Sequence, residues 1–263
     1  MVWKRVRSAL VLAPIVFLAA WFGGPFYAIV VALIALLGAL ELYGMVGLPR
    51  SHPLTWFALL CVVLTIVLAH YEGLYMASLL AAAAVLLFIW LLLGHTPKGR
   101  LTKWLWLMAG IIYLGWMFSR LIPLRELPDG RDWVILTLFT IFATDTAAFF
   151  VGRTWGRHRM APKISPGKTW EGAVGGFAGA VAAAVILAAI MVLPLAYWQI
   201  VVIGILIAVF SQLGDLAESK LKRVVGVKDS GRLIPGHGGM LDRLDSVVFT
   251  IVVVYYYVIW VLL

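Results

Sequence analysis

Long apolar stretches run through almost the whole chain, and most approach the ~20 residues that a helix needs to cross a bilayer. Hydrophobic residues make up 63% of the 263 positions and charged residues 13%, which excludes an ordinary soluble globular domain. We therefore predict an all-α polytopic membrane protein with about nine transmembrane helices. The candidate spans are roughly 9–22, 26–46, 54–70, 74–93, 103–122, 133–152, 172–193, 197–216 and 246–263.

The first apolar stretch follows the basic segment 3–7 and so resembles a signal peptide. Pro14, Trp21 and Phe22 make a cleavage site unconvincing, and we expect a retained first helix. Cys61 is the single cysteine of the sequence, which excludes an intramolecular disulfide and a zinc site built from cysteines.

Basic residues are distributed unevenly between the connections. With the N-terminus in the cytoplasm, 18 of the 21 Lys and Arg residues fall on the cytoplasmic side, and only Arg120, Arg125 and Arg131 fall outside. This asymmetry is typical of the positive-inside rule. We predict a multi-pass protein of the bacterial cytoplasmic (inner) membrane with its C-terminus on the outer side. The net charge of +9 then reflects orientation and anionic substrates, and we expect no nucleic-acid partner.

Two regions are predicted from the position of the polar connections. Residues 1–132 form N-terminal transmembrane helices that serve as scaffold, lipid access route and dimer contact. Residues 133–263 form C-terminal helices with two cytoplasmic loops, 153–171 and 217–245, that carry the catalytic residues.

Acidic residues inside apolar spans are expensive and are candidates for function. Ser211, Asp215 and Glu218 share one helix face, because they are spaced i, i+4 and i+7. Glu41 has a simpler interpretation, as an interfacial side chain that snorkels to water or pairs with Arg50. The acids within the predicted spans or at their ends are Glu41, Asp145, Asp215 and Glu218.

Asp242 and Asp245 are three positions apart. If the last helix begins near Gly239, they share one face of its first turn, where the helix dipole favours carboxylates. Together with Asp215 they supply only hard oxygen ligands, a set that suits Mg²⁺. Capping of the helix by these acids is the alternative interpretation, and it needs no metal.

The segment 217–245 is dense in cations and glycines. A patch for anionic lipid headgroups is one interpretation. However, acids interrupt the cations, and glycines around His237 let backbone N–H groups approach an anion. His237 itself is either a general base or, as we favour, a structural or phosphate-binding residue. The basic and glycine residues that carry this prediction are Lys222, Arg223, Lys228, Arg232, Arg243, Gly236, Gly238 and Gly239.

The other loop contains Gly167-Lys168-Thr169, which superficially resembles the end of a phosphate-binding P-loop. Pro162 stands where that motif requires glycine, so a P-loop is excluded. Ser165, Lys168 and Thr169 nevertheless lie at a loop-to-helix junction, a favourable place for an anion. A plain helix cap by Thr169 is the alternative.

The segment 219–245 resembles the signature of the phosphatidate cytidylyltransferases (CDP-diacylglycerol synthases) over 27 residues. The stretch around Asp145, the loop 165–172 and Gln212-x-Gly214-Asp215 resemble further elements of that family in the same order. The matching signature positions are Ser219, Leu221, Lys222, Arg223, Lys228, Asp229, Gly231, Ile234, Pro235, His237, Gly238, Gly239, Met240, Asp242, Arg243, Leu244 and Asp245.

The resemblance implies that CTP and phosphatidate give CDP-diacylglycerol and pyrophosphate, with Mg²⁺, a second cation such as K⁺, and a homodimer. Rival hypotheses are an archaeal-lipid cytidylyltransferase, a polyprenol kinase or a transporter. We assign Asp215 and Asp242 to the metal, with Asp245 as a further metal ligand or as an anchor for the other two. Asp229 and Ser165 are assigned to orienting phosphates. The predicted phosphate-binding residues are Lys168, Lys222, Arg223, Lys228 and Arg243, and the predicted substrate contacts further include Asp145, Thr169, Gly238 and Gly239.

Overall fold

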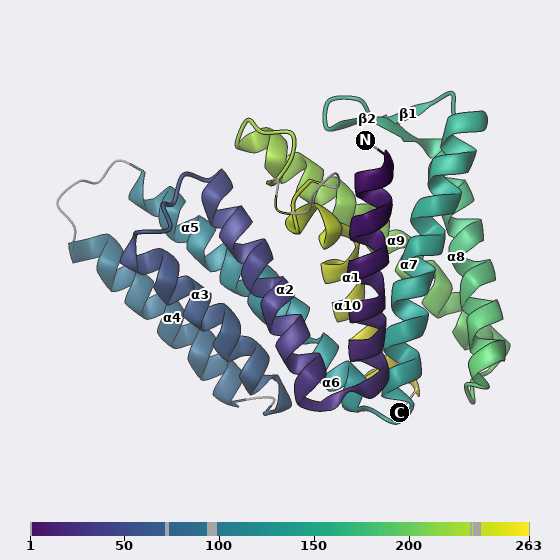
Figure 1. Cartoon of the computed structure of the whole chain (residues 1–263), viewed down its shortest axis with the longest axis horizontal. Coiled ribbons are helices and arrows are strands. Elements are labelled where there is room, and N and C mark those ends of the chain that lie inside the picture. Colours follow the sequence, from purple (N-terminus) through teal and green to yellow (C-terminus); the bar gives the residue numbers. More distant parts are fainter. Residues whose placement is uncertain (1, 72–73, 94–98, 232, 234–237, 263) are drawn as a thin grey trace. The chain divides into compact units, whose positions relative to one another are not determined.

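The computed structural model describes residues 2–71, 74–93, 99–231, 233 and 238–262 (Figure 1). These residues are overwhelmingly helical, and the strands form one small hairpin. The α-helices are α1 (Val2–Phe22), α2 (Gly24–Met45), α3 (Pro53–Val67), α4 (Leu74–Leu93), α5 (Arg100–Gly110), α6 (Leu121–Glu126), α7 (Gly130–Thr154), α8 (Trp170–Met191), α9 (Tyr197–Val224) and α10 (Asp245–Tyr257). The other elements are η1 (Leu68–His70), η2 (Ile111–Met117), η3 (Leu241–Arg243), η4 (Val258–Leu262), β1 (Arg159–Ala161) and β2 (Ser165–Thr169).

Eight helices within the described residues are long and apolar enough to cross a membrane. The first predicted span, 9–22, corresponds to a shorter apolar helix within α1, Leu12–Phe22. The prediction of an all-α polytopic membrane protein is confirmed, with eight full-length spans and one shorter apolar helix.

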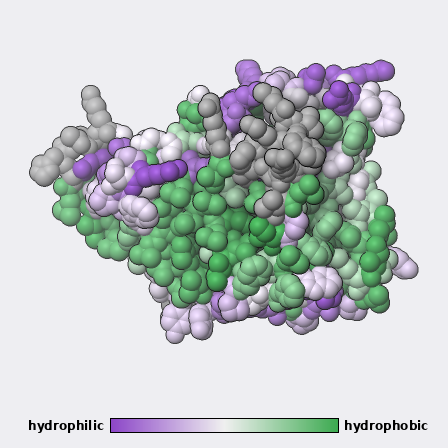
Figure 2. Space-filling view, in the orientation of Figure 1, coloured by the Kyte–Doolittle hydropathy of each residue, from purple (hydrophilic) through white to green (hydrophobic). Residues whose placement is uncertain are grey.

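Large apolar side chains cover much of the visible surface (Figure 2). On α7, for example, Phe139, Phe142, Phe149 and Phe150 are all exposed. Such a face would be unfavourable in water and is the surface expected of a helix in contact with lipid.

The chain divides into two compact units. The first contains Met1–Pro123 and Asp229–Asp242, and the second contains Leu124–Lys228 and Arg243–Leu263. The segment Asp229–Asp242 therefore belongs with the N-terminal helices, although it lies in the C-terminal half of the sequence.

In the first unit, buried tyrosines connect the helices. Tyr43 of α2 is fully buried, and its hydroxyl donates to the carbonyl of Leu107 on α5 at 3.1 Å. Tyr27, also on α2, donates to the carbonyl of Leu121 at 3.3 Å. A buried hydroxyl needs such an acceptor, so these bonds set how the helices meet.

In the second unit, small residues bring α7 and α8 close together. Added Cβ atoms at Gly175 and Gly179 would collide with Val151 and Ala147 of α7, respectively. Glycine lets helices in a membrane approach closely, where packing replaces the missing hydrophobic drive. Helix α9 is tied to α8 by Gln212, whose Nε2 donates to the carbonyl of Ala173 at 3.3 Å.

The predicted loop 153–171 contains the antiparallel hairpin β1–β2. Its base is held by Glu171, whose carboxylate accepts hydrogen bonds from the backbone N–H groups of Arg157 and His158. Glu171 also pairs with Nδ1 of His158 at 2.6 Å. The hairpin presents β2 directly before α8, which begins at Trp170.

Candidate active site

An ion pair joins the hairpin to α9 in the second unit. Lys168 Nζ, at the end of β2, lies 2.6 Å from Asp215 Oδ2 of α9. Ser219, one turn further along α9, donates its hydroxyl to Asp215 Oδ1 at 3.3 Å. Arg223 Nε donates to the carbonyl of Ile164 at 3.3 Å. The loop 153–171 and the end of α9, both predicted to carry the site, therefore meet.

Two further carboxylates face the same pair. Asp145 of α7 interacts electrostatically with Asp215, Lys168 and Arg243 and forms a hydrogen bond with Ser246. Asp245 begins α10, interacts with both Asp215 and Asp145, and accepts a 2.7 Å hydrogen bond from the backbone N–H of Ser246. Helices α7, α9 and α10 thus place three acids in one electrostatic group with two cations, Lys168 of β2 and Arg243 of η3.

A buried ion pair lies beside this group. Lys222 Nζ is 3.2 Å from Glu218 Oε1, one turn away on α9, and both side chains are largely buried. Lys222 also interacts electrostatically with Asp245. A desolvated lysine is a strong electrostatic source, because little water screens its charge. The sequence predicts a phosphate as the partner of Lys222. In the structure, Glu218 and Asp245 balance the charge of Lys222.

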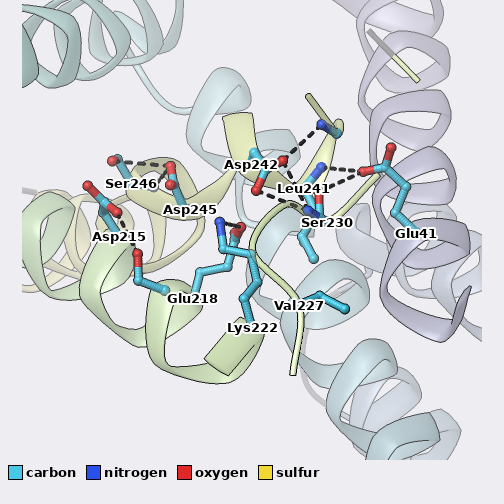
Figure 3. Close-up of polar contacts among 12 residues, drawn as sticks. Glu41, Asp215, Glu218, Lys222, Val227, Ser230, Leu241, Asp242, Asp245 and Ser246 are labelled. Carbon is cyan, nitrogen blue, oxygen red and sulfur yellow. Dashed lines mark hydrogen bonds and ion pairs between the residues drawn. The ribbon is translucent and has the colours of Figure 1, made fainter. Parts of the chain in front are cut away.

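In the first unit, Asp242 connects Ser230 and Gly239 through hydrogen bonds (Figure 3). Its carboxylate accepts hydrogen bonds from the backbone N–H of Ser230 at 3.2 Å and of Gly239 at 2.9 Å. Gly238 has φ +89°, and a Cβ there would approach Asp242 Oδ2. The predicted freedom of Gly239 to offer its N–H to an anion is therefore reduced, since Asp242 already accepts that hydrogen.

The prediction that Asp242 and Asp245 share the first turn of the last helix is wrong. Helix α10 begins at Asp245, and Asp242 lies in the separate 3-10 turn η3. The physical reason is the pair of backbone bonds that draws Asp242 back to Ser230 and Gly239.

No group of three or more His, Cys, Asp or Glu side chains within the described ranges is arranged to hold a metal ion by itself. Asp215 and Asp245 belong to the second unit and Asp242 to the first. The predicted triad therefore stays a prediction, and so does Mg²⁺.

The remaining predicted residues are found in varied settings. Thr169 caps α8 by accepting the N–H of Gly172 at 3.1 Å, as the alternative interpretation held. Ser165 is partly buried in β2. Lys228 and Asp229 are exposed. His237 lies outside the described residues.

Sequence reasoning missed the role of Glu41. The expectation of a snorkelling side chain is wrong, because Glu41 is only 9% exposed. Its Oε2 accepts hydrogen bonds from Ser230 Oγ at 3.1 Å and from the backbone N–H of Leu241 at 3.0 Å. Its place at a helix end was visible in the sequence, but its partners were not. Ser246 was not predicted as a site residue, although it directly follows Asp245. Glu218 and Ser219 were noticed in the sequence, but their partners Lys222 and Asp215 were not assigned.

A model of the cytidylyltransferase family matches residues 3–261. The chain belongs to the cytidylyltransferase family. A phosphatidate cytidylyltransferase of Brucella suis is 35% identical over 255 residues, which cover 95% of this cytidylyltransferase and 91% of the relative.

A phosphatidate cytidylyltransferase of Bacillus subtilis is 42% identical over 146 residues. The match covers 55% of this chain and 54% of the relative. The Escherichia coli protein YnbB, to which no activity is assigned, is 35% identical over 164 residues. The match covers 62% of this chain and 54% of YnbB. The Brucella match extends the resemblance beyond the signature and into the N-terminal helices.

Proposed function

We propose that this cytidylyltransferase transfers the cytidylyl group of CTP to phosphatidate, giving CDP-diacylglycerol and pyrophosphate. The observation that carries the proposal is the Lys168–Asp215 pair, which joins the hairpin to a membrane helix within a group of acids and cations. A membrane-embedded member of this family with such a group is suited to a lipid phosphate and a nucleotide.

The reaction needs no serine or cysteine nucleophile. A phosphate oxygen of phosphatidate, already ionised, attacks the α-phosphorus of CTP. The bond from that phosphorus to the bridging oxygen of the β-phosphate breaks, and pyrophosphate leaves. The protein has to reduce repulsion between two anions and to stabilise charge on the leaving group, which is mainly an electrostatic task.

We assign that task to the cations of the site. Lys168 is the first candidate, because its side chain is mostly buried and its amino group lies beside Asp215. The other proposed phosphate ligands are Lys222, Arg223, Lys228 and Arg243, with Ser165, Thr169, Asp145, Asp229, Gly238, Gly239 and His237 as further contacts.

The acids fit Mg²⁺ by their chemistry, since Asp215 and Asp245 offer only carboxylate oxygens and substrate phosphates complete such sites in other proteins. We propose that Asp215, Asp242 and Asp245 hold Mg²⁺, with a second cation such as K⁺ nearby. Bound there, Mg²⁺ would neutralise charge on the phosphates. Lys168 would then turn from Asp215 towards phosphate oxygens.

We further propose that the protein lies in the bacterial cytoplasmic membrane as a homodimer, with its site facing the cytoplasm. The location of CTP requires that side, and the distribution of Lys and Arg supports it. Accessibility labelling of a cysteine introduced at exposed Lys228 in intact cells tests the orientation.

The decisive experiment mixes the protein, purified in detergent, with CTP carrying label in the cytosine ring, Mg²⁺ and phosphatidate. We expect label in CDP-diacylglycerol and release of pyrophosphate, and we expect Asp215→Asn to abolish both. A phosphorylated lipid with released CDP would instead identify a polyprenol kinase. Preference for an ether-linked isoprenoid acceptor would identify an archaeal-lipid enzyme, and transport without nucleotide chemistry would overturn the proposal.

A further inference from the structure

Glu41 is a buried acid that the proposed chemistry does not use. It lies near the end of α2 with 9% of its surface exposed. Burying a carboxylate is costly unless hydrogen bonds compensate it. Its Oε2 accepts two bonds, from Ser230 Oγ at 3.1 Å and from the N–H of Leu241 at 3.0 Å. Both donors belong to the segment Asp229–Asp242. That segment therefore compensates the burial of Oε2, whereas Oε1 is buried without a hydrogen-bond partner among the described residues.

Ser230 connects Glu41 to Asp242 (Figure 3). The hydroxyl of Ser230 donates to Glu41, while its backbone N–H donates to Asp242 Oδ2 at 3.2 Å. The N–H of Gly239 donates to the same Asp242 oxygen at 2.9 Å. Through Ser230, Glu41 therefore connects the hydrogen bonds around Asp242 to helix α2.

Two glycines bring the segment close to this carboxylate. A Cβ on Gly231 would collide with the Glu41 side chain, and a Cβ on Gly239 would collide with Ser230 Oγ and Glu41. The approach is tight and polar, which gives it a defined position that apolar packing alone would not select.

We propose that Glu41 is a positioning residue for cytidylyl transfer. It holds the segment Asp229–Asp242 on α2 and thereby orients the carboxylate of Asp242, acting on the substrates only through that residue. The expected effect on kcat rests on the proposed function. The anchoring itself follows from the contacts of the first unit.

The kinetic test compares Glu41→Ala, Glu41→Gln and Ser230→Ala in the full-length protein in lipid nanodiscs. Glu41→Ala should lower kcat by about 100-fold with little change in the KM for CTP, because small misplacement of a reacting group acts on the transition state. Glu41→Gln keeps an oxygen that accepts both bonds and should stay within about threefold of the parent protein. Ser230→Ala should lie between them.

Hydrogen–deuterium exchange tests the anchor without reference to activity. Glu41→Ala should speed exchange of the amides of Ser230, Gly239 and Leu241, which are bonded in the parent protein. The matched control is Thr55→Ala, which removes another buried side-chain hydrogen bond of the first unit, from Thr55 Oγ1 to the carbonyl of Pro49 at 3.0 Å. This control should leave exchange in the segment and kcat unchanged.

The outcomes separate the two proposals. Unchanged exchange in Glu41→Ala overturns the anchor, and normal kcat despite faster exchange overturns its role in positioning. Impairment of Glu41→Gln as large as that of Glu41→Ala would show that charge, rather than hydrogen-bond acceptance, matters. If the parent protein makes no CDP-diacylglycerol while Glu41→Ala still speeds exchange, the proposed function fails and the anchor stands.

Discussion

Lys168 Nζ and Asp215 Oδ2 lie 2.6 Å apart, and this ion pair joins a two-stranded hairpin to a helix long enough to span the membrane. The side chains are 22% and 30% exposed, but the amino nitrogen of Lys168 is itself buried, so little water screens its charge. Each partner is also a proposed ligand, Lys168 for phosphate and Asp215 for the metal. The pair holds the two elements together, and under the proposed function its two charges would turn to the substrates and the metal.

Replacing Lys168 by methionine should lower CDP-diacylglycerol synthesis by 100-fold or more. Loss of one preorganised group that stabilises transition-state charge costs roughly 10²–10³ in rate. The control is Lys163→Met, which removes an exposed lysine from the same hairpin without a proposed role. Initial rates at saturating CTP measure the effect, and equal rates for both variants would contradict the assignment.

Removal of divalent metal should abolish synthesis, and added Mg²⁺ should restore it, since carboxylate-bound Mg²⁺ would neutralise the phosphates. Asp245→Asn should then need more Mg²⁺ for half-maximal rate. Asp132→Asn, which removes the partner of Arg131 at the start of α7, serves as control and should follow the parent curve. The measurement is a Mg²⁺ titration of protein from which divalent metal has first been removed with a chelator. Full activity in the chelator would exclude the metal.

Thr169→Ala should destabilise the protein by about 1 kcal/mol, because it removes the side-chain cap of α8. Thr169→Ser keeps the hydroxyl and should restore most of that loss. Thermal unfolding in detergent measures stability, and the KM for CTP measured on the same samples tests substrate contact. If Thr169 only caps the helix, KM will stay unchanged in both variants.

Gly238→Ala should reduce activity far more than the backbone strain of the substitution alone would explain. Its φ of +89° disfavours other residues, and the added Cβ would press on the Asp242 carboxylate. Gly47→Ala isolates the first effect, since Gly47 has φ +71° with open space around it. Each should lose about 1–2 kcal/mol of stability from the backbone strain. Only Gly238→Ala should also lose CDP-diacylglycerol synthesis, and similar activity in the two variants would argue against a role for Asp242.

Much of the architecture followed from the sequence because membrane helices depend on local composition. An apolar run of sufficient length must form a helix in lipid, where each backbone group needs a partner within its own segment. The position of Asp242 departed from expectation, because it lies in η3 and not in the first turn of α10. It depends on where a polar side chain finds its partners, which a hydropathy pattern does not contain.

The chemistry was also readable in part, because the signature residues from Ser219 to Asp245 and the acids Asp145 and Asp215 lie in recognisable local patterns. The sequence thus determined a membrane-embedded enzyme of one family with a defined set of candidate ligands. The structure alone decided the pairings: Lys168 with Asp215, and Glu41 with Ser230 across 189 positions of the chain. The physical reason is that a buried charge is satisfied by whichever donor the packing of distant helices brings to it, and no local pattern encodes that donor.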